Sequence, residues 1–204
     1  MEKDKKRLDL HFELVQYHTQ KMQVKNIIEK HHSYVPSNKS VGRRIDWLIY
    51  HSGYQNLFGL EEPIGMIGVG SSVYQPPKDL LSYVGMTKSE YKDNFNSFAN
   101  NWRYCMTEQI PNAGSQILKL LRHHAPIEWE KKYKNFLTHI ITFVGGGNNG
   151  AVYRADNWDM VGHTAGLPTH DMVSMKWNSK EELKDKFVKP TGENKKLIFV
   201  TRVK

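Results

Sequence analysis

Residues 110–122 read IPNAGSQILKLLR, a short turn of small and polar residues that opens into an amphipathic helix. The segment Asn101–Glu108 before it is a candidate strand, and His139–Val144 after it has the apolar run of a buried strand. The N–H groups that begin a helix lack intrahelical partners and carry partial positive charge, which suits a phosphate. This order predicts a sheet with helices packed on it and an anion site at the turn. An ordinary helix start, with Asn112 as its capping residue, is the alternative.

The other segments extend this pattern to a mixed sheet in one α/β (α+β) domain that spans residues 1–204. Three glycines in the segment 64–73 indicate a close approach by a ligand or by neighbouring backbone. Apolar periodicity and turn residues predict strands at 8–14, 44–50, 64–73 and from 159, a last strand at 196–203 that closes the sheet, helices at 19–30, 116–122, 127–133 and 150–156, loops at 33–40 and 52–63, and a helical or irregular stretch at 87–96.

The chain is basic, because 29 Lys and Arg residues against 21 Asp and Glu residues give a net charge of +8 with His neutral. Two basic runs, Arg122–Lys134 and Lys176–Lys204, suit the phosphates of double-stranded DNA, although solubility alone would also explain the excess. The longest apolar runs are far shorter than the ~20 residues of a membrane helix. Met1–Arg7 has no apolar stretch behind it, which argues against a secretory signal. The single cysteine, Cys105, excludes an internal disulfide, and a cytoplasmic location is expected.

The second half of the chain resembles the GNAT acyltransferase fold, in which strand, phosphate-binding turn, helix and strand precede a helix of recurring residue types. Those residue types stand here at Asn149, Ala151, Tyr153, Trp158 and Gly162. The resemblance implies a single GNAT-like domain. The donor-binding positions that it implies are Asn112, Ala113, Gly114, Ser115 and Gln116. The pyrophosphate signature of that family, Arg/Gln-x-x-Gly-x-Gly/Ala, is absent from residues 110–116. The donor is therefore expected to be an acyl or glycyl group on a small molecule or carrier, with acetyl-coenzyme A as one candidate.

Six short motifs resemble two further families. They lie in order at residues 31–38, 64–73, 100–103, 110–116, 141–144 and 152–158. Together they look like the Mom family of phage DNA-modifying proteins. The segment Tyr153–Trp158, followed by Val161–Thr164, is also similar to the DruA component of Druantia anti-phage systems and related transposon-borne proteins.

The Mom resemblance implies a transferase that converts adenine in DNA to its carbamoylmethyl form at the exocyclic amine, which protects phage DNA from restriction. Its partner would be double-stranded DNA in a bacterial or phage-infected cytoplasm, and it is the reading that we expect. Two alternatives stay open. One is a DruA-like DNA-binding component of an anti-phage or transposon system without this activity. The other is an ordinary GNAT acyltransferase.

Four residues are candidates for the chemistry, namely His31, His32, Tyr153 and Ser71. An imidazole titrates near neutral pH and suits proton transfer from an attacking amine, although exposed histidines also end helices. In the GNAT resemblance Tyr153 would reprotonate a leaving thiolate; its alternative is packing against Trp158. Ser71, next to Ser72, would hold the acyl group in the cleft, or would lie in a surface turn.

Three further groups of residues have less specific expectations. Arg103 would bind a carboxylate or phosphate of the donor, because bidentate contact is usual for a guanidinium, or would be a surface arginine. Asp156 and Asp159 would supply carboxylates if a metal were held with nearby histidines, but no ligand spacing supports such a site and no metal ligand is assigned. Cys105, inside a predicted strand, is expected to be an inert buried thiol.

Overall fold

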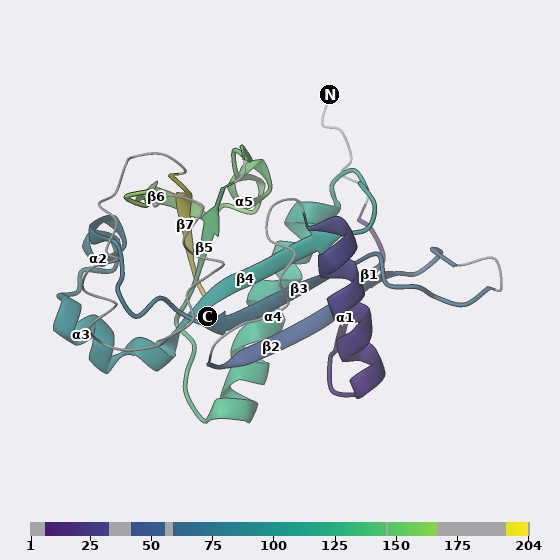
Figure 1. The fold of residues 1–204 in the computed structure, drawn as a ribbon, viewed down its shortest axis with the longest axis horizontal. Helices are drawn as coiled ribbons and strands as arrows, with labels where there is room; N and C mark the ends of the chain where they lie inside the picture. The colour runs from purple at the N-terminus through teal and green to yellow at the C-terminus, as the bar shows by residue number, and fades with distance from the viewer. Residues whose placement is uncertain (1–6, 33–41, 56–58, 146, 167–194, 204) are drawn as a thin grey trace, which may run out of the picture.

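The computed structural model describes residues 7–32, 42–55, 59–145, 147–166 and 195–203. Seven strands form one sheet in the order β1-β2-β3-β4-β5-β7-β6 (Figure 1). Neighbouring strands are antiparallel except β4 and β5, which are parallel. The strands are β1 (Leu10–Leu14), β2 (Arg44–His51), β3 (Gly65–Ser71), β4 (Phe98–Met106), β5 (His139–Val144), β6 (Asp159–His163) and β7 (Leu197–Arg202). A mixed sheet with helices is the predicted architecture.

Helices cover both faces of this sheet. They are α1 (His18–His31), α2 (Lys78–Val84), α3 (Lys88–Asp93), α4 (Ala113–Tyr133) and α5 (Ala151–Ala155), with a 3-10 turn at Phe95–Ser97. In Figure 1, α1 lies in front of the sheet and α4 lies behind it. The largest apolar cluster lies on the α4 face, whereas α1 packs on the opposite face against Leu48, Met66 and Trp102. Within the described residues, no helix combines the length and apolarity needed to cross a bilayer.

Helix α4 is continuous, which corrects the prediction of two separate helices at 116–122 and 127–133. Pro126 removes one N–H donor and costs roughly 3 kcal/mol in a helix interior. The apolar positions nevertheless keep helical spacing through it, with Leu121 and Ala125 before the proline and Trp129 after it, all fully buried. The Trp129 indole also donates to the carbonyl oxygen of Asn96 at 3.0 Å. Burial of this face outweighs the local preference of proline.

Other elements differ in position from the prediction. Helix α2 has no counterpart among the predicted elements, and β4 begins at Phe98 rather than at Asn101, because residues 98–100 pair with β5 and residues 99 and 100 also pair with β3. The last strand does not close the sheet at an edge, since β7 lies between β5 and β6. The predicted loop at 33–40 lies outside the described residues.

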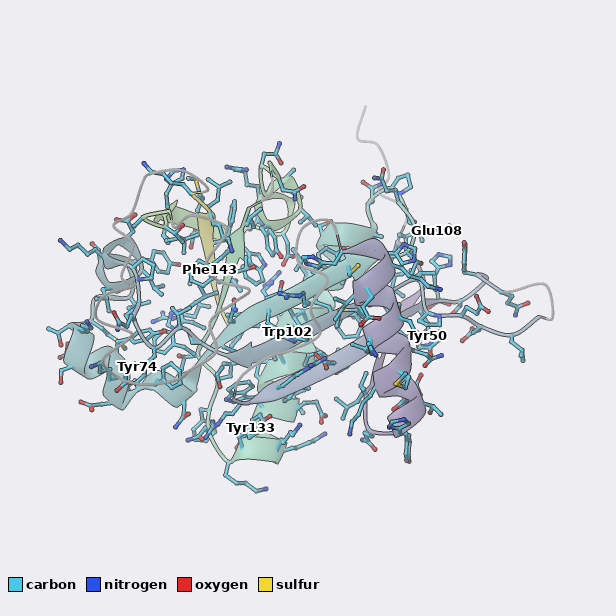
Figure 2. All side chains as sticks on the ribbon, viewed as in Figure 1. Tyr50, Tyr74, Trp102, Glu108, Tyr133 and Phe143 are labelled. Carbon is cyan, nitrogen blue, oxygen red and sulfur yellow. The ribbon has the colours of Figure 1, made fainter. Side chains whose placement is uncertain are left out.

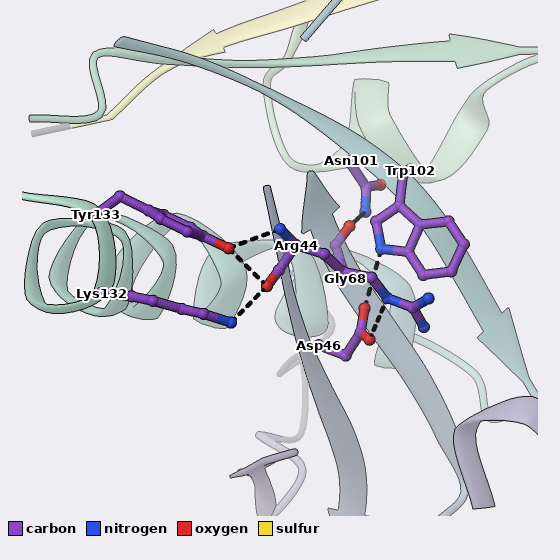
Figure 3. Close-up of polar contacts among 7 residues, drawn as sticks. All are labelled: Arg44, Asp46, Gly68, Asn101, Trp102, Lys132 and Tyr133. Carbon is purple, nitrogen blue, oxygen red and sulfur yellow. Dashed lines mark hydrogen bonds and ion pairs between the residues drawn. The ribbon is translucent and has the colours of Figure 1, made fainter. Parts of the chain in front are cut away.

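The glycines of β3 make room for side chains and backbone of the neighbouring strands. A Cβ at Gly68 would lie 2.3 Å from Oδ1 of Asp46 and 2.4 Å from Nε1 of Trp102. A Cβ at Gly70 would lie 3.1 Å from the carbonyl oxygen of Arg43. The indole of Trp102 uses the space over Gly68 to donate to Asp46 at 2.9 Å (Figure 3). The close approach predicted from these glycines is therefore made by the protein itself.

Candidate active site

Strands β4 and β5 diverge after a short parallel pairing. Residues 98–100 pair with residues 139–141, and the described residues show no further pairing, although β4 continues to Met106 and β5 to Val144. A cleft of about 390 Å³ lies where the strands separate. Trp102 on β4 and Phe143 on β5 are two of its lining residues (Figure 2). The fold thus has an opening between two interior strands of its sheet.

Four parts of the fold meet at this cleft: the end of α1, strand β4, strand β5 and the start of α5. The lining residues are His31, His32, Asn101–Met106, Thr142–Val144 and Asn148–Tyr153. Of the predicted site residues, the structure brings His31, His32, Arg103 and Tyr153 together here. None of the described lining residues is Asp or Glu, so the ionisable groups among these residues are basic or phenolic, apart from the Cys105 thiol.

Tyr153 reaches the cleft from α5 and is held by a buried amide. Its hydroxyl donates to Oδ1 of Asn101 at 2.9 Å. Nδ2 of Asn101 donates in turn to the carbonyl oxygens of Gly68 at 2.8 Å and of Arg103 at 3.0 Å, and Figure 3 shows the first of these bonds. The Tyr153 ring also meets Trp158 edge to face, with centroids 5.1 Å apart. Packing and a place in the cleft, which the sequence posed as alternatives, therefore occur together.

The two histidines lie at the C-terminal end of α1. His31 is the last helical residue and is exposed, whereas His32 follows the helix and is half-buried. Burial, and then the positive charge of Arg103, lower the pKa of the His32 imidazole to about 4. At neutral pH this ring is therefore uncharged, and one of its nitrogens is a proton acceptor.

The pKa of His32 predicts a specific pH dependence of stability. An unfolded histidine titrates near ~6.5, so between about pH 6.5 and pH 4 the unfolded chain binds a proton that the folded chain does not. The free energy of unfolding should fall as pH decreases through that window. Because the ring is half exposed and solvent screens it, we expect a contribution of about 1 kcal/mol.

Urea unfolding of the wild type and of His32→Asn at pH 7 and pH 5 measures this contribution. The wild type should lose about 1 kcal/mol more than the variant on going to pH 5. His124 and His139, whose pKa values burial also lowers, are present in both proteins and cancel in the difference. Equal losses of unfolding free energy in the two proteins would contradict a lowered pKa at His32.

Arg103 is the main fixed charge of the cleft. Its Nη1 donates to the carbonyl oxygen of Trp102 at 2.7 Å. After burial, its charge is the second cause of the lowered pKa of Lys196, as it is for His32. The aliphatic part of Lys196 lies along Gly145, at the end of β5, where a Cβ would come within 3.0 Å of Cγ. The positive charge of Arg103 therefore acts on both His32 and Lys196.

The predicted donor turn forms the N-terminal end of α4. Asn112 is the N-cap residue of α4, as the alternative predicted, but it adopts the left-handed conformation, with φ 63°, and its side chain makes no capping hydrogen bond. The Gln116 amide accepts from the N–H of Leu8 at 3.0 Å and donates to the carbonyl oxygen of Asn112 at 3.3 Å. Gly114 faces α5, where a Cβ would lie 2.3 Å from Cγ2 of Val152.

Packing explains the small residues of this turn. Ala113 is buried in the main apolar cluster, and Gly114 allows α5 to approach α4. A large side chain at Gly114 would therefore displace α5 and would not leave the fold intact. The five turn residues, Ser115 included, are not among the residues that line the cleft, but Val152, which covers Gly114, is. The first-turn N–H groups of α4 remain the feature that suits a phosphate.

Ser71 is not brought to the cleft. It pairs with Ala99 near the start of β4, and its Oγ accepts from the N–H of Arg43 at 2.8 Å. Ser72 shares a hydrogen bond with the hydroxyl of Tyr91 at 2.6 Å. Because β3 runs antiparallel to β4, the end of β3 lies far from the end of β4 where the strands diverge. The position of Ser71 therefore gives no support to a role in holding an acyl group.

Asp156 is an ion-pair partner of α4. Its carboxylate accepts from Nε and Nη2 of Arg122 at 2.9 Å and 2.8 Å, and from the indole of Trp158 at 2.9 Å. Asp159 accepts from the hydroxyl of Tyr83 at 2.5 Å. In the part of the chain that the structure describes, no three His, Cys, Asp or Glu side chains are grouped to hold a metal ion. Asp156 serves to fasten α5 to α4.

Asn101 and Tyr104 are cleft residues to which the sequence analysis assigned no role. Burial, and then the neighbouring Tyr153, raise the pKa of Tyr104 far above its usual value, so this phenol stays protonated. Burial likewise raises the pKa of the neighbouring Cys105 to about 11, which keeps the thiol protonated and unreactive. The signal in the sequence is the pair Asn100-Asn101 inside a strand, since asparagine is depleted in strands.

Comparison with known families supports the DruA resemblance. A family model described as Druantia protein DruA matches residues 1–197. The chain belongs to the DruA family. No curated protein matches it.

The solved structures similar to this DruA-family chain share its fold at low identity. Arabidopsis thaliana NAA60 in complex with acetyl-CoA is 14% identical, with a TM-score of 0.56 and coverage of 95% of this chain and 98% of that chain. The C-terminal condensation domain of Ebony is 10% identical, with a TM-score of 0.51 and coverage of 97% and 100%. A Desulfovibrio desulfuricans protein assigned to the GNAT acetyltransferases is 7% identical, with a TM-score of 0.51 and coverage of 96% and 99%. The predicted GNAT-like fold is confirmed.

Proposed function

We propose that this DruA-family chain is a GNAT-type transferase that modifies DNA at the exocyclic amine of adenine, the activity that the Mom resemblance implies. The observation that carries the proposal is the cleft between β4 and β5. It gathers Tyr153, two histidines and Arg103, which are groups suited to proton transfer and anion binding. It does so without a carboxylate among its described lining residues.

The proposed acceptor is an amine that is uncharged at neutral pH. The exocyclic amine of adenine carries no charge, because its lone pair is delocalised into the ring. To reach the cleft, the base would leave the stack of the duplex.

The donor is proposed to lie against the N-terminal end of α4. Residues 109–114, QIPNAG, depart from the pyrophosphate signature Arg/Gln-x-x-Gly-x-Gly/Ala only at Asn112. Asn112 has the positive φ that glycine adopts most readily. This single replacement makes a phosphate-bearing acyl donor such as acetyl-coenzyme A a better candidate than the sequence alone indicates. The Arabidopsis NAA60 structure, which is similar in fold, is in complex with acetyl-CoA.

His32 is proposed to carry the proton of the reaction. The low pKa of its imidazole keeps the ring uncharged at neutral pH. Once the amine nitrogen has bonded to the donor carbon it is cationic and strongly acidic, so even a weak base can take its proton. The imidazolium formed in this way is itself a strong acid and can return the proton to the leaving group.

A second cleft, of about 620 Å³, is proposed to contact the DNA backbone. It lies at the opposite end of α1 from the first, and its charged lining residues are Lys21, Arg44, Asp46, Glu128, Lys131 and Lys132. Arg44 is paired with Asp46 and Lys131 with Glu128, which leaves a net positive charge. Lys132 reaches across to the carbonyl oxygen of Arg44 at 2.8 Å (Figure 3). Such a surface suits phosphates, and binding through it should weaken steeply with salt.

The test is mass analysis of nucleosides from the DNA of cells that express the chain. We expect a modified deoxyadenosine with the wild type and at least about a hundredfold less with His32→Ala or Tyr153→Phe, the lower end of general acid–base contributions. Tyr91→Phe is the matched control, because it removes a buried tyrosine hydroxyl outside the cleft. The control should modify DNA as the wild type does.

The outcomes separate the candidate functions. A wild-type rate in both cleft variants would contradict the assignment of this cleft. Salt-dependent DNA binding without any modified nucleoside would instead support a DNA-binding component without transferase activity. That alternative is favoured by the second cleft, which supplies cations independently of the first.

A further inference from the structure

Strand β1 is an edge strand of the sheet, and part of its outer edge is unpaired. The N–H of Val15, just after the strand, donates to the carbonyl oxygen of Asp46 at 3.0 Å. In an antiparallel pair, residues that bond to the neighbouring strand alternate with residues whose N–H and C=O groups point away from it. The odd-numbered residues of β1 therefore bond to β2. Leu10, Phe12 and Leu14 direct their backbone groups to the outer edge.

Glutamine side chains close this edge on either side of the three residues. The Gln116 amide of α4 accepts from the N–H of Leu8 at 3.0 Å, and the Gln20 amide of α1 accepts from the N–H of Gln16 at 2.7 Å. Between them, the outward groups of residues 10, 12 and 14 have no hydrogen-bond partner in the part of the chain that the structure describes. The open stretch is therefore short and bounded at both ends.

The opposite edge of the sheet is protected. Strand β6 has an irregular register between Met160 and Gly162, and α2 lies against it, where Asp79 accepts from the N–H of His163 at 3.3 Å. In contrast, β1 pairs with β2 without irregularity, and its residues LHFEL include no lysine or proline, which natural edge strands use to prevent further pairing. Of the two edge strands, β1 is the one that can accept another strand.

The sequence of β1 is self-complementary in one antiparallel register. If the Phe12 residues of two copies lie opposite each other, Leu10 faces Leu14 of the second copy, and these pairs exchange about six backbone hydrogen bonds. On the face toward α4, the three side chains are apolar and only partly buried, so each would bury further surface. On the other face, exposed His11 lies opposite Glu13 of the second copy, a favourable cross-strand pair.

The glutamine caps favour this register over its neighbours. The next pair along the strands would join Leu8 to Gln16 of the second copy, and both of these N–H groups are already bonded. Sliding the strands by two residues would place Leu14 opposite Leu8, or Leu10 opposite Gln16. Either shift would leave one of the open residues without a partner.

We propose that β1 is the interface of a symmetric dimer, in which the β1 strands of two copies of this chain pair antiparallel about Phe12 and join the two sheets. A second copy fits this edge because it offers the same three open residues in the matching register, with His11 and Glu13 complementing each other across the two-fold axis. The interface is independent of the proposed transferase function, since none of the cleft-lining residues between β4 and β5 belongs to β1.

Hydrogen exchange of backbone amides, followed by NMR, tests the interface in the wild type. Where most chains are dimeric, the monomer fraction falls as the inverse square root of concentration, and amides that exchange only in the monomer slow with it. Over about a hundredfold rise in concentration, the amides of Leu10, Phe12 and Leu14 should therefore slow about tenfold. The amide of Asn94, bonded to Glu90 at the end of the short helix α3, is the control and should keep its rate. Sedimentation equilibrium over the same range should give the mass of two chains.

Disulfide cross-linking tests the register. In the proposed pairing, the Cα atoms of His11 and of Glu13 of the second copy lie about 4.5 Å apart, within the range of a disulfide. Two His11 residues, or two Glu13 residues, would lie more than about 8 Å apart, outside that range. Oxidation of a mixture of His11→Cys and Glu13→Cys should therefore join one variant to the other, and either variant alone should give little dimer. The native Cys105 is buried and does not compete.

Each contrary outcome overturns the proposal. A chain that stays monomeric over this range has no such interface. A dimer whose three amides exchange at a constant rate pairs through another surface, and slow exchange at every concentration means that the chain itself covers the edge. Equal cross-linking of the single variants and of their mixture would overturn the register. If Glu13→Cys, which loses the bond from Gln20, does not fold, hydrogen exchange of the wild type still decides.

Discussion

Replacement of Asp156 by alanine is expected to lower the free energy of unfolding by about 3 kcal/mol. The carboxylate is 6% exposed and accepts three hydrogen bonds, two from Arg122 and one from the indole of Trp158. Without it, a guanidinium that is about two-thirds buried and a buried indole N–H both lose their partner. Breaking a buried pair from one side costs more than the pair contributes, because the other charge is left uncompensated.

The matched control is Glu128→Ala, which breaks the ion pair with Lys131 elsewhere on the same helix. The Lys131 side chain is 66% exposed, so water replaces the lost contact and we expect a change within about 0.5 kcal/mol. Urea unfolding followed by circular dichroism measures both variants. Similar losses in the two would mean that Asp156 is not the fastening between α4 and α5.

The ion pair between Asp156 and Arg122 gives a structural role to the segment 153–158, which carries the family resemblance. Tyr153 enters the cleft, Asp156 fastens α5 to α4, and Trp158 donates to Asp156 while packing on Tyr153. One short segment therefore joins a cleft residue to the contacts that hold it in place. A change at Asp156 should disturb the cleft without touching a ligand.

The fold was predictable where local patterns match tertiary packing. The turn at 110–115, the apolar spacing of α4 and the run at 139–144 all lead to the observed order of elements. The sequence did not predict that α4 is one continuous helix. Pro126 is a local signal for a helix break, and only the burial of the apolar face on both sides of it keeps the helix continuous. The place of β7 between β5 and β6 follows from pairing across a long connection, which sequence periodicity does not encode.

The site was predictable in part for the same reason. His31, His32, Arg103 and Tyr153 came from motifs and residue types, and the cleft contains all four. The location of Ser71 depends on the direction of β3 relative to β4. Because the two strands are antiparallel, Ser71 lies at the end of the sheet away from the cleft. The role of Asn101 depends on three contacts from three strands or helices, so it emerges only from the folded chain.

Gly68→Ala is expected to lower the free energy of unfolding by about 2–3 kcal/mol, at the upper end of the cost of overpacking. The new methyl group would lie 2.3 Å from Oδ1 of Asp46 and 2.4 Å from Nε1 of Trp102, well inside contact distance. These two atoms are themselves hydrogen-bonded, and Arg44 binds the same carboxylate at 2.6 Å and lies over the indole ring, 4.0 Å from its centroid (Figure 3). The three side chains cannot all shift without losing one of these contacts.

Gly70→Ala on the same strand is the control for adding a methyl group to β3. Its Cβ would lie 3.1 Å from one carbonyl oxygen and 3.7 Å from Trp102, so a shift of a few tenths of an ångström relieves it and we expect less than about 1 kcal/mol. Thermal or urea unfolding gives the two changes, and equal losses would show that the Asp46–Trp102 contact can yield. Because Trp102 also lines the cleft, Gly68→Ala should in addition move the NMR methyl signal of Met106, whereas Gly70→Ala should leave it in place. Gly68, one of the three glycines for which the sequence predicted a close approach, is therefore expected to act on the cleft through the tryptophan that it accommodates.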